Sequence, residues 1–486
     1  MRSDKHKVKG TRKQPGKFAR LTRKWSILFV LLAAGFLGIT IYSGFLVAKY
    51  LTITCAIVGA ITLLLFFPLF SYRFKQSRRI FSFCLSLLFG AAYVMGAIYV
   101  GSTIGFFDRI TGGGYTTDEY YVIVRDDDQF AAFEDLQGET VHSYKSGSTW
   151  EDARAQLEEE ISVDLVIETD LTQTVDDLLE GNTDVIFLSA ASYTVTKESR
   201  DSFEDYTKIL KTIQVKAQVN DFSKGVQVTK DSYNIYVTGL DTSGDISYNS
   251  RSDVNMIITV NPKTKTILLT SIPRDYYVEM ASTGEYDKLT HTGNEGPQET
   301  VQAAENMLGL EINYYLKVNY STVISLVDAI DGIDIVSEFE FETHGQDWYY
   351  FEAGPNHLYG EEALAFCRER QSFENGDLQR NQNQQIVLAA ILEKMTSSST
   401  LLTSYTDILD ALGNTMETNM SSDDIRALVR MQQADMASWT IQQQAIIGES
   451  DMKYSPMLGD YASVVDQDPE SIAAARKQIQ QVMNGQ

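Results

Sequence analysis

Cysteine is scarce in this 486-residue sequence, which contains three. Cys55 and Cys84 fall within long apolar runs, so Cys367 has no partner in the polar remainder of the chain. This placement excludes an intramolecular disulfide in the polar part. We therefore expect that part to be held together by its hydrophobic core alone.

Charged residues are missing from three long stretches near the N-terminus: Trp25–Val47, Tyr50–Phe70 and Ile80–Phe107. At about 1.5 Å of helix per residue, each stretch can cross a hydrocarbon layer roughly 30 Å thick. A cleaved signal peptide has a single, shorter apolar segment, so the presence of three long runs argues against a signal peptide. We predict three transmembrane helices at residues 25–107, after a basic cytoplasmic tail at residues 1–24.

Basic residues flank the three runs unevenly. Ten precede Trp25 and four lie between the second and third runs, whereas only Lys49 lies between the first and second. Because positively charged loops stay on the cytoplasmic side, the N-terminus is expected inside. Three crossings then place everything after about residue 108 outside. The prediction is a multi-pass protein of the cell membrane with extracellular C-terminal domains.

The rest of the chain is poor in basic residues and rich in acidic ones. Residues 110–486 contain 25 basic and 63 acidic residues, a net charge of −38. Nucleic-acid binding needs a basic surface, so no nucleic-acid partner is expected. The basic tail contains no recognisable helix-turn-helix, and membrane topology accounts for its charge.

Residues 115–215 alternate strand-like and helix-like segments, which predicts a small α/β domain. No catalytic constellation stands out there. We interpret this region as an extracellular accessory domain, with ligand binding as the alternative. The expected strands cover residues 120–124, 165–168 and 185–189, and the expected helices cover residues 150–160 and 172–180.

A second α/β pattern follows a polar linker and occupies residues 230–486. Asn261-Pro-Lys-Thr-Lys between two β-rich runs predicts a hairpin. The tail from about residue 401 is expected to be mostly helical. The expected strands cover residues 233–240, 254–260, 266–272, 312–318 and 439–447, and the expected helices cover residues 298–308, 321–330 (capped by Ser321) and 378–395 (capped by Asp377).

The hairpin gathers charged residues at the end away from its turn. If Val260 opposes Thr266, Asp253 lies opposite Pro273 and Arg251 opposite Asp275. Arg274 lies at the same end. The preceding strand ends at Leu240, which brings Asp241 toward the same edge.

Two further pairs of candidate site residues lie downstream, and each contains arginine. Arg368 and Arg370 are two residues apart and share a face if that stretch is extended. Arg380 and Gln384 are four apart and share a face of the long helix, in the first turns that favour anions. Val387, Leu388 and Ile391 are expected on its opposite, packing side.

Five arginines converging with two or three aspartates suggest a phosphate site. The arginine fork matches phosphate oxygens, and aspartates can hold Mg²⁺, which bridges to phosphate. The number of arginines suggests a pyrophosphate. Scattered surface ion pairs are the alternative. No P-loop, HExxH, GxSxG or CxxC motif competes, and His291, His344 and His357 lack metal-ligand spacing.

From about Tyr233 to Met395 the sequence resembles the LytR-CpsA-Psr family, and within it the CpsA (Wzg) proteins of streptococcal capsule loci. The three-helix anchor and the extra α/β domain are also similar to the CpsA arrangement. One departure is Thr290 before His291, where the family usually has Asn. The resemblance is carried by Gly239-Leu-Asp-Thr-Ser-Gly, Arg251-Ser-Asp-Val, Ser271-Ile-Pro-Arg-Asp, Lys288-Leu-Thr-His, Cys367-Arg-Glu-Arg and Gly376-Asp-Leu-Gln-Arg-Asn-Gln-Asn-Gln-Gln.

The resemblance implies an α/β/α sandwich with a mixed central sheet and a hydrophobic tunnel for a polyprenyl chain. It implies an Mg²⁺-dependent transferase that moves capsular polysaccharide or a related glycopolymer from an undecaprenyl-pyrophosphate carrier to peptidoglycan. Other capsule-assembly membrane proteins are expected partners. Asp241 and Asp253 would hold Mg²⁺. Pyrophosphate binding would fall to Arg251, Arg274, Arg368, Arg370, Arg380, Gln384 and Lys288, and catalysis to Asp241, Arg251, Asp253, Arg274, Arg368 and Arg370.

Several alternatives stay open at this point. Attack at phosphorus gives a phosphodiester, whereas attack at the anomeric carbon gives a glycosidic bond. Asp275 is a candidate base. The competing functions are a non-catalytic membrane regulator of capsule gene expression or chain length, and a lipid pyrophosphatase.

Overall fold

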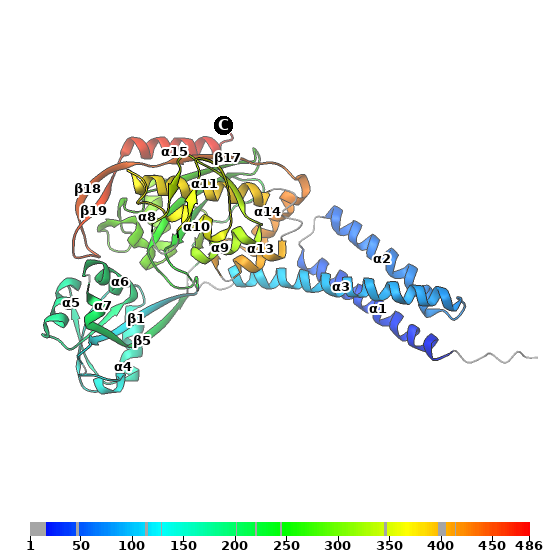
Figure 1. Cartoon of the computed structure of the whole chain (residues 1–486), viewed down its shortest axis with the longest axis horizontal. Helices are drawn as coiled ribbons and strands as arrows, with labels where there is room; N and C mark the ends of the chain where they lie inside the picture. The colour runs from blue at the N-terminus through cyan, green and yellow to red at the C-terminus, as the bar shows by residue number, and fades with distance from the viewer. Residues whose placement is uncertain are drawn as a thin grey trace, which may run out of the picture. The chain divides into compact units, whose positions relative to one another are not determined.

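The computed structural model describes residues 16–44, 48–111, 115–127, 129–200, 202–218, 221–243, 245–344, 348–396, 405–413 and 415–486 (Figure 1). The chain divides into two compact units, residues 1–105 and residues 106–486. Each unit is described by itself. Residues 1–15 of the predicted basic tail lie outside the described residues.

The first unit consists of three apolar helices, α1 (Lys17–Ser43), α2 (Ala48–Phe70) and α3 (Gln76–Thr111). Each is long and apolar enough to cross a membrane, which confirms the three predicted apolar helices. Aromatic rings pack between them, with Phe29 stacked on Tyr93. Large apolar side chains such as Leu64 remain exposed, as expected of helices whose outer faces contact lipid.

The second unit begins with a five-stranded mixed sheet of order β3-β2-β4-β1-β5. The parallel strands β3, β2 and β4 adjoin the antiparallel pair β1 and β5. Strand β2, helix α6 and strand β5 were not predicted. The elements of this part are β1 (Tyr115–Arg125), η1 (Phe133–Leu136), β2 (Thr140–Tyr144), α4 (Trp150–Glu160), β3 (Asp164–Glu168), α5 (Leu171–Glu180), β4 (Val185–Ser189), α6 (Ala190–Ser199), α7 (Phe203–Tyr206) and β5 (Thr207–Gln218).

A second mixed sheet, of order β16-β11-β6-β7-β8-β17, forms the centre of the remaining residues. Strand β6 pairs in parallel with β11 and antiparallel with β7, and β8 pairs in parallel with β17. This confirms the predicted mixed sheet. The strands are β6 (Tyr233–Leu240), β7 (Ser252–Asn261), β8 (Thr266–Ile272), β11 (Tyr314–Val318), β16 (Met416–Thr418) and β17 (Thr440–Ala445).

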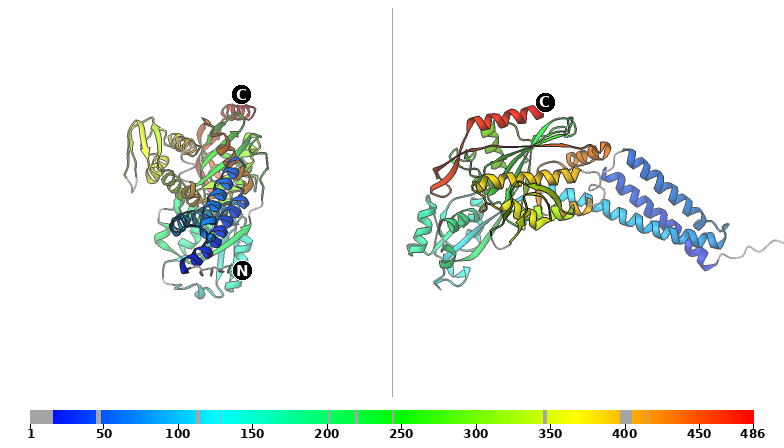
Figure 2. Two further views of the ribbon diagram at one scale, coloured as in Figure 1. Left: turned by 90° about the vertical axis from the view of Figure 1, so that its right-hand side faces the viewer. Right: turned by 45° about the horizontal axis from the view of Figure 1, so that its top comes forward.

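Helices cover both faces of this sheet, giving the expected α/β/α arrangement (Figure 2). One face packs on α8 and α15 through a core that includes Leu308 and Ala475. The other packs on α11 and α14 through side chains such as Leu392 and Leu428. The helices are η2 (Leu289–Glu295), α8 (Pro297–Leu308), α9 (Tyr320–Ala329), α10 (Gly360–Arg368), α11 (Gly376–Thr396), α13 (Tyr405–Leu412), α14 (Ser422–Asp435) and α15 (Pro469–Met483).

The C-terminal tail contains more strand than the sequence suggested. Besides β16 and the expected strand β17, it forms an antiparallel hairpin of β18 (Gly448–Ser455) and β19 (Asp460–Gln467). Helices α13, α14 and α15 still outweigh the strands of the tail, but the prediction of a single strand there was wrong. The other short antiparallel pairs are β9 (Tyr277–Glu279) with β10 (Tyr286–Lys288), β12 (Ile333–Ser337) with β15 (Gly354–Leu358), and β13 (Phe341–Glu342) with β14 (Tyr350–Phe351).

The register predicted for the β7–β8 hairpin was wrong by one residue. Asn261, not Val260, opposes Thr266. The Asn261 side chain accepts hydrogen bonds from the backbone N–H groups of Lys263 and Thr264, and Lys265 adopts a left-handed conformation with φ of 55°. These features close a four-residue loop in place of the expected five-residue one.

Two predicted helix caps were also wrong. Helix α9 is capped by Asn319, whose side chain accepts a hydrogen bond from the Thr322 N–H, and not by Ser321. Asp377 lies within the first turn of α11 instead of capping it.

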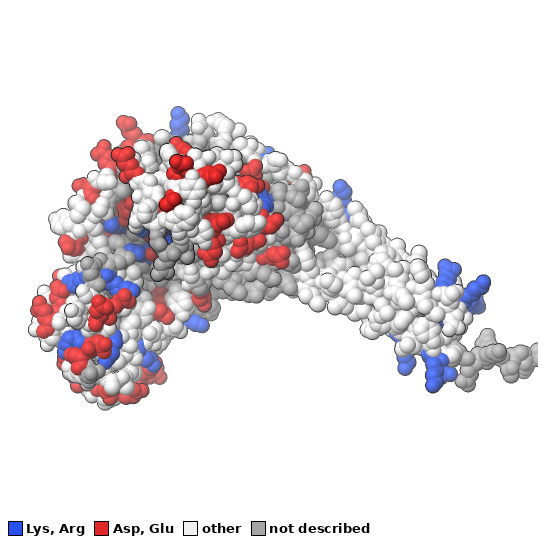
Figure 3. All heavy atoms as spheres, in the orientation of Figure 1, with Lys and Arg blue, Asp and Glu red and all other residues white. Residues whose placement is uncertain are grey.

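The two units differ in surface character (Figure 3). The helical unit is uncharged along most of its length, whereas acidic side chains are spread over the second unit.

The predicted domain boundaries at residues 115–215 and 230–486 stay predictions.

Candidate functional site

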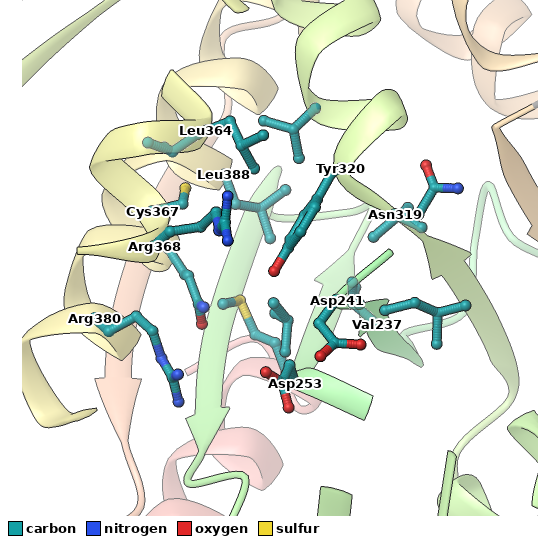
Figure 4. Close-up of a pocket in the computed structure, with 18 of the residues that line it drawn as sticks. Val237, Asp241, Asp253, Asn319, Tyr320, Leu364, Cys367, Arg368, Arg380 and Leu388 are labelled. Carbon is teal, nitrogen blue, oxygen red and sulfur yellow. The ribbon is translucent and has the colours of Figure 1, made fainter. Parts of the chain in front are cut away.

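A cavity of about 500 Å³ opens where the parallel strands β6 and β11 end. Helices α10 and α11 and the start of α9 close it on the other side (Figure 4). Ligands commonly bind at the carboxyl ends of parallel strands. The sequence places Asp241 directly after β6 and Asn319 directly after β11, so both enter this cavity.

Two aspartate–arginine pairs form part of its charged lining. Arg251 Nη2 lies 3.0 Å from Asp241 Oδ2, and Arg274 Nη1 lies 2.7 Å from Asp253 Oδ2. The Thr290 hydroxyl donates to the other oxygen of Asp253 at 3.0 Å. Burial lowers the pKa of Arg274, but Asp253 and Asp275 raise it by more, so this arginine is firmly cationic.

Arg380 approaches from α11 and is only 5% exposed. Its Nη2 lies 3.1 Å from Asp377 Oδ1, and its Nε has no hydrogen-bond partner among the described residues. Burial, followed by the neighbouring Arg274, lowers the pKa of Arg380. A buried guanidinium with incomplete compensation is suited to an anionic ligand.

Arg368 and Arg370 complete the basic lining. The shared face expected for an extended stretch does not apply, because Arg368 is the last residue of α10. Its guanidinium lies 4.7 Å from the Tyr320 ring centroid. Arg370 lies 3.6 Å from Asp377, and the chain turns tightly here: a Cβ on Gly376 would lie 2.3 Å from the Arg370 carbonyl oxygen.

The inner part of the cavity is apolar. Val387, Leu388 and Ile391 line it together with Arg380 and Gln384, so the prediction that they face the opposite side of α11 was wrong. Positions 380, 384, 387, 388 and 391 follow the helical repeat and form one stripe. The cavity therefore has a cationic mouth and an apolar interior, as expected of a site for a charged head with an apolar chain.

Most of the predicted site residues meet in this cavity, but two do not. Lys288 Nζ lies 3.2 Å from Asp275 Oδ1, and neither residue lines the cavity. Asp275 Oδ2 is also 3.5 Å from Arg274 Nε, so this carboxylate supports the cavity residue Arg274 from outside the lining. The predicted residues that line the cavity are Asp241, Arg251, Asp253, Arg274, Arg368, Arg370, Arg380 and Gln384.

Tyr320 and Asn319 are cavity residues that sequence reasoning missed. The Tyr320 hydroxyl points into the cavity (Figure 4). Burial raises the pKa of Tyr320, although Arg368 acts in the other direction, so the phenol stays a neutral donor. Asn319 and Tyr320 lie at the junction of a parallel strand and a helix, and this position was the available sequence signal for a place in the site.

The two carboxylates suit a divalent cation that is shared with a ligand. Asp241 and Asp253 lie next to each other in the charged part of the cavity (Figure 4). Among the described residues, no group of three or more His, Cys, Asp or Glu gathers to hold a metal. The chain thus offers two carboxylates, and the remaining ligands have to come from phosphate and water. That division fits Mg²⁺, which keeps several waters and is commonly held by one or two carboxylates.

The histidines and Cys367 have structural surroundings. His291, His344 and His357 pair with acidic side chains outside the cavity, as expected of ordinary structural or surface histidines. Burial raises the pKa of the Cys367 thiol to about 12, so it lines the cavity as a neutral group.

Comparison with known proteins identifies relatives of this chain. The model of the LytR_cpsA_psr family matches residues 192–478. The polyisoprenyl-teichoic acid–peptidoglycan teichoic acid transferase TagU of Bacillus anthracis is 34% identical over 231 residues, 46% of this chain and 74% of the relative. TagU of Enterococcus faecalis is 32% identical over 228 residues, with 46% and 74% coverage. The crystal structure of Bacillus subtilis TagV covers 52% of this chain and 98% of its own, with 29% identity and a TM-score of 0.44.

Proposed function

The chain belongs to the LytR-CpsA-Psr family, and from this premise we propose that it transfers a polyisoprenyl-linked glycopolymer to peptidoglycan. Relatives that are 32–34% identical to it over about 230 aligned residues are named as transferases of this kind. The observation that carries the proposal is the cavity itself, where arginines and two aspartates surround the entrance to an apolar interior.

The donor we propose is an undecaprenyl-pyrophosphate glycopolymer. Its two phosphates would be held by arginine forks at the mouth, with Arg380 as the deepest cation. Gln384 would donate to a phosphate oxygen. The first isoprene units would lie against Val387, Leu388 and Ile391. The lipid's charged and apolar parts thus match the two halves of the cavity.

Asp241 and Asp253 would hold Mg²⁺ in the loaded site. Bound there, the cation supplies Lewis-acid stabilisation of charge on the phosphates. The arginines supply the rest of that stabilisation, because their positive charge is already fixed around the leaving group before the reaction starts.

The step we propose is attack by an acceptor hydroxyl on the phosphorus nearest the polymer. A new O–P bond forms, the bridging P–O bond of the pyrophosphate breaks, and the lipid leaves as its monophosphate. The departing phosphate, held by Arg274 and Arg380, takes up the proton that the hydroxyl loses. Asp275 is not required as a base, because its carboxylate pairs with Lys288.

The membrane unit has a place in this scheme. The uneven basic residues around the three helices favour a cytoplasmic N-terminus and an extracellular second unit. Enzyme and lipid donor would then share one bilayer surface, which raises their encounter rate. A C-terminal tag on intact cells should be cleaved by added protease; protection until lysis would refute this orientation.

We propose capsular polysaccharide or a closely related glycopolymer as the transferred polymer, with capsule-assembly membrane proteins as partners. The support is the resemblance of the motif set, the three-helix anchor and the preceding α/β domain to streptococcal CpsA proteins. Transfer should be faster from a lipid-linked capsule precursor than from lipid-linked teichoic acid. Equal rates would leave the enzyme class intact and refute the polymer assignment.

The central experiment uses the purified full-length chain, a lipid-pyrophosphate glycopolymer, peptidoglycan and Mg²⁺. Transfer should be lost in Asp241→Ala and Arg274→Ala. The matched control is Arg200→Ala, because Arg200 is exposed to a similar degree as Arg274 and pairs with Asp176 at 2.6 Å far from the cavity. Full transfer by both site variants would refute the site.

The same assay separates the alternatives. Pyrophosphate cleavage that is unaffected by added peptidoglycan would identify a lipid pyrophosphatase. Absence of any reaction, with capsule length altered equally by wild type and by Arg274→Ala in cells, would identify a non-catalytic regulator.

A further inference from the structure

A second cavity of about 510 Å³ lies beside the five-stranded sheet of residues 106–486. One wall comes from that sheet and its connections, through Asp118, Tyr120, the loop at residues 144–148 and the start of α6. The other comes from segments around the six-stranded sheet, through Asn249, η2, the β9–β10 turn and the β18–β19 turn. Its volume is within the range of small-molecule sites. No residue of the arginine cavity lines it.

Carboxylates crowd one part of this second cavity. Glu295 is largely buried, and burial together with Glu299 and Asp118 raises its pKa to about 7. Burial also raises the pKa of Asp118, despite hydrogen bonds from Thr149 and Asn249. Within the described part of the chain, neither Asp118 nor Glu295 forms an ion pair with a basic side chain. A positively charged ligand group would relieve this crowding.

Hydroxyl donors gather on the wall that comes from the five-stranded sheet. Ser146, Ser189 and Ser192 form a triangle with oxygen–oxygen distances of 2.7, 2.8 and 3.0 Å. Ser189 and Ser192 are buried, so their hydroxyls are held in place. Lys145 also lines the cavity and carries a positive charge that is paired with Glu151 at 2.6 Å. This wall can receive a carboxylate, because the hydroxyls can turn their protons toward an anion.

The loop from Asp241 to Arg251 connects the two cavities. Its ends carry the Asp241–Arg251 pair of the first cavity, and Asn249 lines the second. Asn249 donates to Asp118 at 2.9 Å and accepts from the buried Lys317 at 3.2 Å. The Thr117 N–H also donates to the Ser247 carbonyl at 2.9 Å. A ligand in the second cavity therefore lies on the far side of the loop that holds the arginine site.

We propose that the second cavity binds an amino-acid or peptide group with both an ammonium and a carboxylate. The ammonium pairs with Glu295 and Asp118, and the carboxylate meets Ser146, Ser192 and Lys145. The assignment of this group to the acceptor rests on the proposed function, since peptidoglycan carries peptide side chains. The cavity then holds the acceptor by its peptide while its sugar hydroxyl reaches the pyrophosphate across the loop.

Calorimetry on the full-length chain in detergent tests this site without any reaction. The probe is L-lysyl-D-alanine, and its Nα,Nε-diacetyl form lacks the ammonium groups. The dipeptide should bind, and acetylation should weaken binding at least about tenfold, the usual range for a lost charge-assisted hydrogen bond. Glu295→Gln and Ser192→Ala should each weaken it to a similar extent. Glu158→Gln, an acid-to-amide change on the outer part of α4, is the matched control and should bind normally.

Arg274→Ala separates this inference from the proposed function. Dipeptide binding should survive this change, because Arg274 does not line the second cavity. Absence of binding to the wild type, or equal binding of the acetylated dipeptide, would overturn the inference while leaving the lipid assay interpretable. Loss of binding in Arg274→Ala would place the dipeptide in the arginine cavity and overturn it as well. Failure of glycopolymer transfer with dipeptide binding intact would instead count against the proposed function.

Discussion

Arg380→Met should make the protein more stable and its site weaker. Arg380 is almost fully buried, its Nε is unsatisfied among the described residues, and Arg274 repels it. Methionine has a similar length and removes both the desolvation and the repulsion. Replacing buried charges by apolar side chains stabilises proteins by roughly 1–4 kcal/mol in favourable cases. Asp377 loses one partner but is largely exposed, so the cost on that side is small.

Ligand binding should change in the opposite direction. A charge-assisted hydrogen bond contributes about 1.5–3 kcal/mol, so inorganic pyrophosphate with Mg²⁺ should bind roughly 10- to 150-fold more weakly. Thermal unfolding should shift upward by about 2–4 °C per kcal/mol. Calorimetry and a melting curve on the same preparation measure both effects. Arg200→Met is the control and should change neither by much. A variant that melts lower yet binds pyrophosphate normally would refute this reasoning.

Three further predictions concern titration, backbone space and metal. The pKa of Glu295 is raised to about 7 from an ordinary 4.5. Its contribution to folding stability is therefore fully present below about pH 4.5 and is lost as the pH rises through 7. Glu295→Gln should melt at a higher temperature than the wild type above pH 7, and the difference should shrink toward about pH 5. Gly376→Ala should destabilise the fold by about 1–3 kcal/mol and reduce transfer, because the added Cβ would meet the Arg370 carbonyl oxygen. The control is Gly225→Ala, where a Cβ meets open space, and it should change neither stability nor transfer. Normal melting and transfer by Gly376→Ala would contradict the close approach. Pyrophosphate should bind at least about tenfold more tightly with Mg²⁺ than with EDTA, and Asp241→Asn should abolish most of that difference; equal affinities with and without the metal would remove its assignment.

The sequence was most informative where periodicity and composition act locally. The type of the three apolar helices and the type and bounds of α4 and β4 were predicted accurately, because each has one dominant pattern. The start of α1 was not, because this helix begins at Lys17 within the predicted tail. The convergence of Asp241 and Arg274 was also predictable, since both lie beside strand ends. Long-range pairing was not: β17 joins β8 in parallel across more than 160 residues, and no local pattern specifies that partner.

The errors at the site have identifiable physical causes. The hairpin register depended on the Asn261 side chain closing a shorter loop, which moves Asp253 toward Arg274. Arg368 belongs to a helix because α10 continues through it, although spacing alone allowed an extended stretch. Lys288 has the right chemistry for a phosphate, but Asp275 binds it first.

The pairing of charges in the arginine cavity explains why anion and cation should bind together. Arg251 and Arg274 already have carboxylate partners, so a pyrophosphate that takes these arginines gains little on its own. It would also leave the half-buried Asp241 and Asp253 without a counter-charge, which is costly. A divalent cation held by these two carboxylates would remove that cost. Arg380 is different because it has no buried carboxylate to give up, so it can attract the anion before the metal arrives. Such an exchange of partners would make the loaded site depend on both ligands, and in the resting protein it keeps Arg251 and Arg274 paired.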